Sequence, residues 1–126
     1  MTVYLINVRV SNYESYEDYR SWSLVHKIFS TKEKAIEYIN NEDNLKSIIK
    51  KDENSLYHMG IDHLDIPLQI KMRINENDLK TFDAWPYDEI FSEDGNEIIG
   101  YKPCENPSHW DMAHYEVSIV EWEVED

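Results

Sequence analysis

Apolar and polar residues alternate along several short stretches of the chain, a pattern typical of β-strands with one buried face. Residues 3–11 show it first, with Tyr4, Ile6, Val8 and Val10 on one face. Residues 67–74 (PLQIKMRI) show it most clearly, with one face made of Leu68, Ile70, Met72 and Ile74. Both stretches predict strands of a sheet that has one buried and one solvated face.

Two further strands are predicted at residues 19–29 and 114–124. The earlier one should pair with residues 3–11 as a hairpin, because a polar turn joins the two. Its expected inner face carries Trp22, Leu24 and Ile28. Along residues 114–124 the apolar positions change face between Ile119 and Val120, which predicts a bulge or a face switch.

Helical spacing follows the second strand in the stretch IFSTKEKAIEYIN, residues 28–40. Ser30 and Glu33 are spaced as a capping box, in which each side chain accepts a hydrogen bond from the backbone N–H of the other. Apolar residues then recur at helical spacing at Ala35, Ile36 and Ile39. The stretch therefore predicts the start of a helix and no catalytic role.

A second short helix is predicted from the spacing of Leu45, Ile48 and Ile49. Its cap should lie near Asp43 or Asn44, since both side chains can accept from a free backbone N–H. The two helices together should lie within residues 31–52.

Two shorter patterns complete the expected elements. Residues 77–86 (NDLKTFDAWP) begin with cap candidates and end with a proline, so one or two helical turns are expected there. Residues 89–100 predict a β-hairpin, because Asp94-Gly95 suits a type I′ turn. The expected register pairs Phe91 with Ile98 and Ile90 with Ile99.

These elements predict an α+β fold in which residues 1–126 form one domain, a twisted antiparallel sheet with two short helices packed on one face. The expected strands are residues 3–11, 19–29, 67–74, 89–100 and 114–124. The expected core consists of Leu5, Ile6, Val8, Trp22, Leu24, Ile28, Ala35, Ile36, Ile39, Leu45, Ile48, Leu68, Ile70, Met72 and Ile74.

The composition limits the class of protein. The chain has 126 residues, of which 41% are hydrophobic, with only 3 glycines and 4 prolines, so it should fold around one core. Its single cysteine, Cys104, cannot form an intramolecular disulfide, and the N-terminus has no signal-peptide pattern. We therefore expect a soluble cytoplasmic protein without a membrane-spanning segment.

Charge is the most unusual property of the chain. It has 12 basic and 26 acidic residues, a formal net charge of −14. Residues 75–126 hold 15 of the acidic and 2 of the basic residues, a net charge of −13. Such a field repels phosphates and attracts basic surfaces, so we expect a basic protein partner and no direct binding of nucleic acid.

Candidate catalytic and metal-binding residues lack the spacing that such sites need. The densest group of potential ligands is Cys104, His109, Asp111 and His114. No CxxC or HxxxH pair anchors this group, and no GxSxG, HExxH or P-loop motif is present in the sequence. We therefore expect no catalytic residues, no metal, no cofactor and no enzymatic activity.

The N-terminal strand VYLINVRV, the stretch FSTKEKAIEYI and the acidic final strand YEVSIVEWEVED resemble small uncharacterised proteins of phages and prophages in low-GC bacteria. The resemblance covers residues 3–40 and 114–126. It implies a compact α+β scaffold of residues 3–52 and 114–126, with an insertion-like middle, residues 55–105, that contains the hairpin. It also implies a phage origin and no catalytic residues.

The predicted partner contacts lie on two acidic segments. The C-terminal part of the chain supplies Asp83, Asp88, Glu89, Glu93, Asp94 and Glu97. Tyrosine among carboxylates is typical of protein-binding surfaces, which makes the segment NYESYEDY the second candidate. Its contact residues would be Tyr13, Tyr16, Glu14 and Glu17.

Three classes of function fit these observations. The first is a small phage-type inhibitor that binds a basic host protein such as an RNA-guided nuclease, as an anti-CRISPR protein does. The second is an immunity protein that neutralises a basic toxin, and the third is a non-catalytic domain whose acidity keeps it soluble. The sequence leaves the oligomeric state open.

Overall fold

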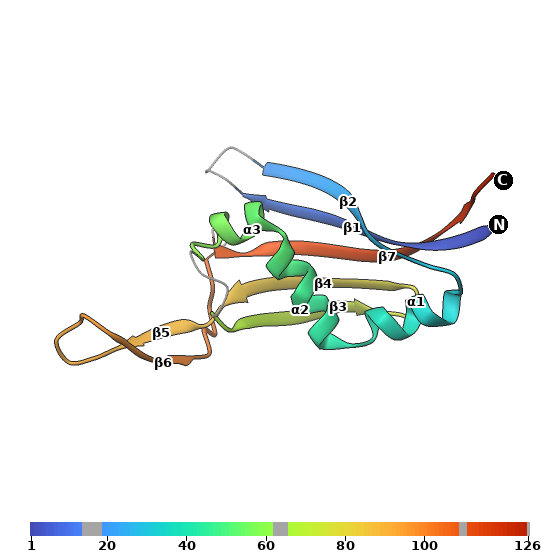
Figure 1. Cartoon of the computed structure of the whole chain (residues 1–126). Helices are drawn as coiled ribbons and strands as arrows, with labels where there is room; N and C mark the ends of the chain where they lie inside the picture. Colours follow the sequence, from blue (N-terminus) through green and yellow to red (C-terminus); the bar gives the residue numbers. More distant parts are fainter. Residues whose placement is uncertain (14–18, 62–65, 109–110, 126) are drawn as a thin grey trace.

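The structure, a computed structural model, describes residues 1–13, 19–61, 66–108 and 111–125. These residues form a five-stranded antiparallel sheet, a two-stranded sheet and three short helices, which confirms the α+β class (Figure 1). No helix in the described part is long and apolar enough to cross a lipid bilayer. The elements are β1 (Thr2–Tyr13), β2 (Tyr19–Phe29), α1 (Lys32–Ile39), α2 (Glu42–Lys51), α3 (Glu53–His58), β3 (Leu68–Asn75), β4 (Leu79–Pro86), β5 (Asp88–Phe91), β6 (Ile98–Lys102) and β7 (Ala113–Glu123).

The five-stranded sheet has the strand order β2-β1-β7-β4-β3, so the first and last strands of the chain lie side by side. β1 and β7 pair antiparallel without a register shift. The amino group of Met1 donates a hydrogen bond to Glu123 Oε1 at 3.0 Å, which links the two ends of the chain. The predicted hairpin of the first two strands is confirmed as the antiparallel pair β1–β2.

The helices cover one face of this sheet, as predicted (Figure 1). α1 begins after Thr31, whose hydroxyl accepts a hydrogen bond from Lys34 N at 3.3 Å. The predicted capping box of Ser30 and Glu33 is therefore wrong: the cap lies one residue later, and Lys34 stands where a capping box needs Glu or Gln. Thr31 can replace Ser30 as the cap because both residues carry the same hydroxyl acceptor.

α2 begins after Asn41, whose Oδ1 accepts a hydrogen bond from Asp43 N at 2.9 Å. The predicted cap at Asp43 or Asn44 is wrong by two or three residues. Glu42 and Asp43 instead occupy the first turn, where their carboxylates interact favourably with the positive end of the helix dipole.

α3 extends the helical layer beyond the predicted residues 31–52, and a buried polar cluster fixes it to the sheet. Asp52 caps α3, accepting hydrogen bonds from Ser55 N at 3.3 Å and from Ser55 Oγ at 2.7 Å. The hydroxyl of Tyr115 on β7 donates to the same carboxylate at 3.3 Å. Burial raises the pKa of Tyr115, so the phenol stays neutral and acts as a donor.

The hydrophobic core lies between the helices and one face of the sheet. Within it the rings of Phe82 and Tyr115 stack with their centroids 5.2 Å apart. The predicted core residues that are buried are Ile6, Val8, Ala35, Ile39, Leu45, Ile48 and Leu68. Those that are half-buried are Leu5, Trp22, Ile36, Ile70 and Met72. The exposed ones are Leu24, Ile28 and Ile74.

β-Bulges explain two of these three exceptions. The β1–β2 register shifts near His26, and the shift turns Ile28 to the face that the helices leave uncovered. A second shift, between Met72 and Ile74, turns Ile74 to the same uncovered face. One extra residue moves every later side chain of a strand to the other face, and an alternating sequence does not show it. Leu24 keeps its predicted face but lies on an edge strand.

β4 is the largest difference between the predicted and the observed fold. Residues 77–86 predict helical turns, but most of them form a strand between β7 and β3. Lys80 hides the alternation, because it occupies an inward position where it is 3% exposed and donates a hydrogen bond to Asn75 Oδ1. Pro86 ends a strand and not a helix.

β5 and β6 form a sheet of their own, so the predicted placement of residues 89–100 in the main sheet is wrong. The ribbon projects from the end of the main sheet that lies away from the chain termini (Figure 1). We call residues 88–102 the arm, and the other described residues the body. Residues 68–86 supply two strands of the main sheet. Of the strands in the predicted insertion, residues 55–105, only those of the arm lie outside the main sheet.

Candidate functional site: a projecting acidic arm

The arm is a two-stranded antiparallel ribbon. The predicted pairing of Phe91 with Ile98 is confirmed. Ile90 lies opposite Gly100 instead of Ile99, because the register shifts between Ile90 and Phe91. A Cβ on Gly100 would make only an ordinary van der Waals contact with the Ile90 side chain, at 3.9 Å.

Large apolar side chains lie along the arm without being buried. Their exposed fractions are 37% for Ile90, 52% for Phe91, 41% for Ile98 and 65% for Ile99. A two-stranded ribbon is only marginally stable by itself in water, and these four residues do not contribute to the core. Exposed apolar side chains that lie close together are a common feature of surfaces that bind another molecule.

The tip of the arm is a loop that Asp94 orders. Its Oδ1 accepts hydrogen bonds from the hydroxyl of Ser92 and from the backbone N–H of Asn96. Gly95 has a φ of 76°, whereas no described residue other than glycine has a positive φ, so the predicted type I′ turn is wrong. The hydrogen bonds, first that from Ser92 and then that from Asn96, lower the pKa of Asp94. Its carboxylate is therefore charged at neutral pH.

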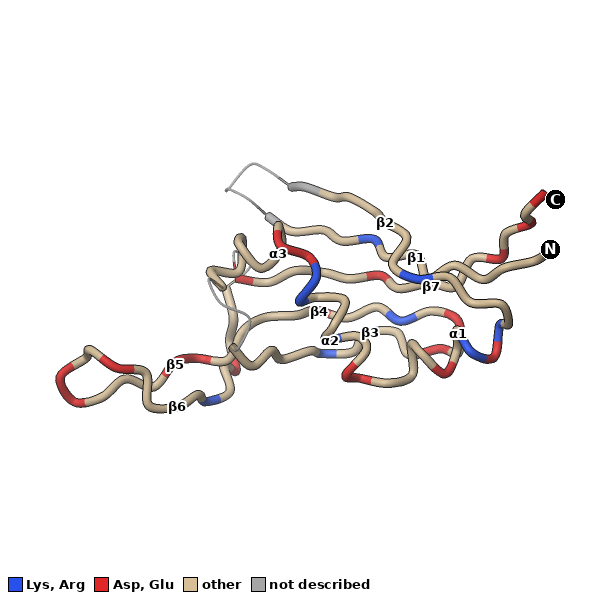
Figure 2. Tube along the Cα trace, in the orientation of Figure 1, with Lys and Arg blue, Asp and Glu red and all other residues tan. Residues whose placement is uncertain are grey.

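Acidic residues occur along the arm as far as its tip (Figure 2). Glu93, Asp94 and Glu97 are exposed at the tip, and Asp88 and Glu89 lie on β5. Against these five acids the arm has one basic residue, at position 102. The arm can therefore offer a partner both charge complementary to a basic surface and apolar area.

Asp83 does not belong to this acidic surface, contrary to the prediction. It lies on β4 in the body, where it is 7% exposed. Its carboxylate binds Arg73 Nη1 at 3.4 Å and also the Nδ1 of His114. Because this carboxylate is buried and already bound to two side chains of the body, it is poorly accessible to a partner. Of the second predicted segment, Tyr13 ends β1. Its other predicted contact residues, Glu14, Tyr16 and Glu17, lie outside the described part of the chain.

Asp83 is part of a polar cluster on the uncovered sheet face that the sequence does not reveal. The cluster borders a depression of about 480 Å³. Strand pairing puts Ser11, His114 and Asp83 side by side in one row. A catalytic triad of a hydrolase has a serine nucleophile, a histidine base and an acid in the same order. Among the described residues, His114 hydrogen bonds to Asp83 but has no bond to Ser11. The row therefore lacks the contact between nucleophile and base that acyl transfer needs.

The potential metal ligands of the sequence do not converge in the part that the structure describes. His114 is paired with Asp83 on the sheet, whereas Cys104 and Asp111 line the pocket at the base of the arm. His109 is outside the described residues. No group of three His, Cys, Asp or Glu side chains among the described residues is arranged to hold a metal ion.

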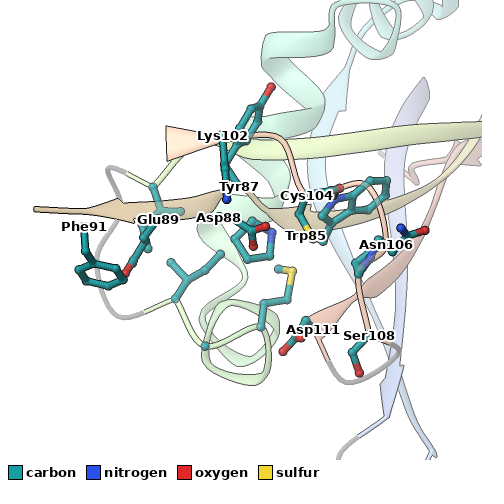
Figure 3. A pocket seen from close by; sticks show the side chains of 16 residues that line it. Trp85, Tyr87, Asp88, Glu89, Phe91, Lys102, Cys104, Asn106, Ser108 and Asp111 are labelled. Atoms are coloured by element: carbon teal, nitrogen blue, oxygen red, sulfur yellow. Dashed lines mark hydrogen bonds between the residues drawn. The ribbon is translucent and has the colours of Figure 1, made fainter. Parts of the chain in front are cut away.

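A pocket of about 640 Å³ lies where the arm meets the body (Figure 3). Asp88 and Phe91 line it from the arm, and Trp85 from β4. The indole Nε1 of Trp85 donates hydrogen bonds to Gln69 Oε1 at 2.9 Å and to Cys104 O at 3.0 Å. These bonds attach the segment after β6 to the sheet, so the arm projects from a firm base.

Comparison with protein-family models, with curated proteins and with solved structures gives no match. The resemblance to phage proteins therefore stays a prediction. The candidate site rests on the geometry and charge of the arm.

Proposed function

We propose that this protein is a non-catalytic inhibitor that uses its arm to bind a basic, nucleic-acid-handling protein. The observation that supports this function best is the combination found on the arm: five acidic residues and four exposed apolar side chains on one projecting ribbon. Neither set stabilises the body. The acidic residues and the exposed apolar side chains would both make favourable contacts with a basic protein surface that has apolar pockets.

A groove that holds nucleic acid fits the arm in charge and in shape. Such grooves are lined with Arg and Lys side chains that bind phosphates. The carboxylates of Glu93, Asp94 and Glu97 would replace the phosphates at the tip. Phe91 and Ile99 would bury apolar surface behind them, which favours the complex. The firm base lowers the entropy that is lost when the arm binds.

Within this class we place first a host RNA-guided nuclease, because the sequence resembles phage proteins. A basic toxin would present the same chemistry to the arm. The neighbouring genes distinguish the two, since the gene of an immunity protein directly follows that of its toxin.

A capture experiment tests the proposal. The immobilised protein and a triple variant, in which Glu93, Asp94 and Glu97 are changed to Lys, are exposed to nuclease-treated host lysate, and mass spectrometry identifies the captured proteins. We expect the unaltered protein to enrich basic nucleic-acid-binding proteins, and added DNA to displace them. The variant should lose them, because the reversed charges replace attraction with repulsion.

A second triple variant, in which Glu37, Glu76 and Glu125 are changed to Lys, is the control. These acids are exposed on the body, and their reversal changes the net charge by the same amount. It should capture the same proteins as the unaltered chain. Equal capture by both variants, or a captured set without nucleic-acid-binding proteins, would contradict the proposal. With a purified partner, the arm variant should associate ~10-fold more slowly or worse at low salt.

A further inference from the structure

The sheet face opposite the helices has an apolar surface at the end near the chain termini. Strand pairing puts Ile28, Leu5 and Val120 in one row across β2, β1 and β7. Val3 and Trp122 form the next row towards the termini. Ile28 and Trp122 are each 59% exposed. We give the name apolar patch to the residues Val3, Leu5, Val25, Ile28, Val120 and Trp122.

A change of face along β7 supplies two of the six residues of this patch, Val120 and Trp122. Ile119 pairs with Ile6 on the side of the helices, whereas Val120 pairs with Leu5 on the uncovered side. The register with β1 is continuous here, so the predicted irregularity is a face switch and not a bulge. The strand is thus apolar on both faces over a short distance. Strands of this composition are normally covered on both sides.

The patch also differs in charge from the rest of the molecule. The row that follows it towards the middle of the sheet contains Asn7, Ser118 and Leu79 beside Val25. The described residues named in these three rows include no charged side chain, and the first charged neighbour is Glu76, which lies across from Leu79 at the outer end of the third row. The chain has a net charge of −14, so two copies repel each other at most other surfaces. A second copy meets the least electrostatic cost at the patch.

We propose that two copies of this chain associate through the apolar patch, sheet against sheet. Its exposed members, Val25, Ile28, Val120 and Trp122, present on the order of 400 Å² of apolar surface. A stable dimer buries about 800 Å² on each partner, and somewhat more than half of that area is apolar. The patch together with a polar rim therefore has the size that a dimer requires.

The neighbouring polar row is complementary to itself in such a dimer. Arg9 on β1 lies across from Glu116 on β7. A two-fold axis that runs parallel to these two strands and between them brings Arg9 of one copy opposite Glu116 of the other, with the strands of the two sheets aligned. The arms lie at the other end of the sheet (Figure 1). The dimer therefore leaves both arms free, and a partner with two sites would bind it more tightly than a single copy.

Sedimentation equilibrium from low micromolar to submillimolar concentration tests the proposal. The unaltered protein should be a dimer, and Trp122→Glu should raise its dissociation constant ~100-fold or more, because a carboxylate in the apolar contact would lose its hydration. Ile99→Glu is the matched control: it makes the same kind of change at a 65% exposed residue of the arm and should leave the dimer intact. Circular dichroism checks that both variants fold.

A charge exchange tests the two-fold arrangement. Arg9→Glu and Glu116→Arg should each weaken the dimer by a few-fold, and the two changes together should restore it, because the complementary pair is formed again. A monomer at every concentration would overturn the proposal, as would a dimer that survives Trp122→Glu or one that Ile99→Glu dissociates. If the double variant dimerises even more weakly than either single variant, the proposed two-fold arrangement is wrong.

Discussion

The body and the arm contain the same kinds of residue in opposite environments. In the body, strand residues such as Phe82 and Val117 are 1% and 0% exposed beneath the helices. In the arm, Phe91 and Ile99 are 52% and 65% exposed on a ribbon that ends in an acidic loop. The free energy of folding therefore comes from the body. The proposed contact with another molecule would account for the composition of the arm.

Truncating one phenylalanine in each region should give the largest contrast. Phe82→Ala should lower the free energy of unfolding by about 3–5 kcal/mol, because it leaves a cavity beside the Tyr115 ring. Phe91→Ala should change it by less than about 0.5 kcal/mol, because the side chain is not part of the core. Urea unfolding followed by circular dichroism measures both. Similar losses in the two variants would show that the arm shares the core of the body.

A second contrast is a pH dependence that belongs to the body. His26 Nε2 lies 2.8 Å from the Tyr38 hydroxyl oxygen, and burial, then Lys51, then Lys27, lower the pKa of His26. The unfolded chain therefore takes up a proton at a pH where folded His26 is still neutral. The contribution of neutral His26 to the stability of the folded state is fully present above about pH 6.5. It is lost as the pH falls through the lowered pKa of His26.

Replacing His26 by Gln should reduce this loss, because an amide can still bond to the Tyr38 hydroxyl but takes up no proton. Urea midpoints of both proteins between about pH 8 and about pH 5 measure the effect. The same fall in the two midpoints would assign the pH dependence to other groups.

The smallest expected effect is confined to the tip of the arm. Asp94→Ala removes the acceptor of the Ser92 hydroxyl and of the Asn96 N–H, so amide hydrogen exchange at the tip should become several-fold faster. The urea midpoint of the body should not change. Since the pKa of Asp94 is lowered, its ordering effect is present above about pH 4 and is lost as the pH falls through that lowered value. Unchanged exchange in Asp94→Ala would mean that the backbone alone orders the loop.

The strands β1 and β3 could be predicted from the uninterrupted alternation of their sequences. β7 could also be predicted, although its apolar positions change face between Ile119 and Val120. β4 could not, because two of its buried positions hold Lys80 and Asp83. Each is stabilised by a tertiary partner, such as Asn75 for Lys80, and a residue pattern does not contain that partner. The bulges near His26 and Ile74 were hidden for a related reason, since only the pairing of strands reveals an extra residue.

Part of the candidate site could be predicted from the sequence. The acids of the tip stand out as charges around Asp94-Gly95. The exposure of Phe91 and Ile99 could not be predicted, because a short apolar strand has the same sequence whether it lies in a sheet or outside it. The face switch between Ile119 and Val120 is visible in the sequence, but its meaning depends on which face the helices cover.

The claim that the arm is dispensable for folding and required for binding is tested most directly by removing it. An Asn-Gly turn can replace residues 90–100, because Glu89 and Tyr101 are cross-strand partners that a two-residue turn can join. Capture from the nuclease-treated lysate is then compared for the shortened and the full chain, with urea unfolding as the control for folding. We predict that the shortened chain unfolds cooperatively within about 1 kcal/mol of the full chain and captures none of its basic proteins. Undiminished capture by a folded, shortened chain would contradict the account.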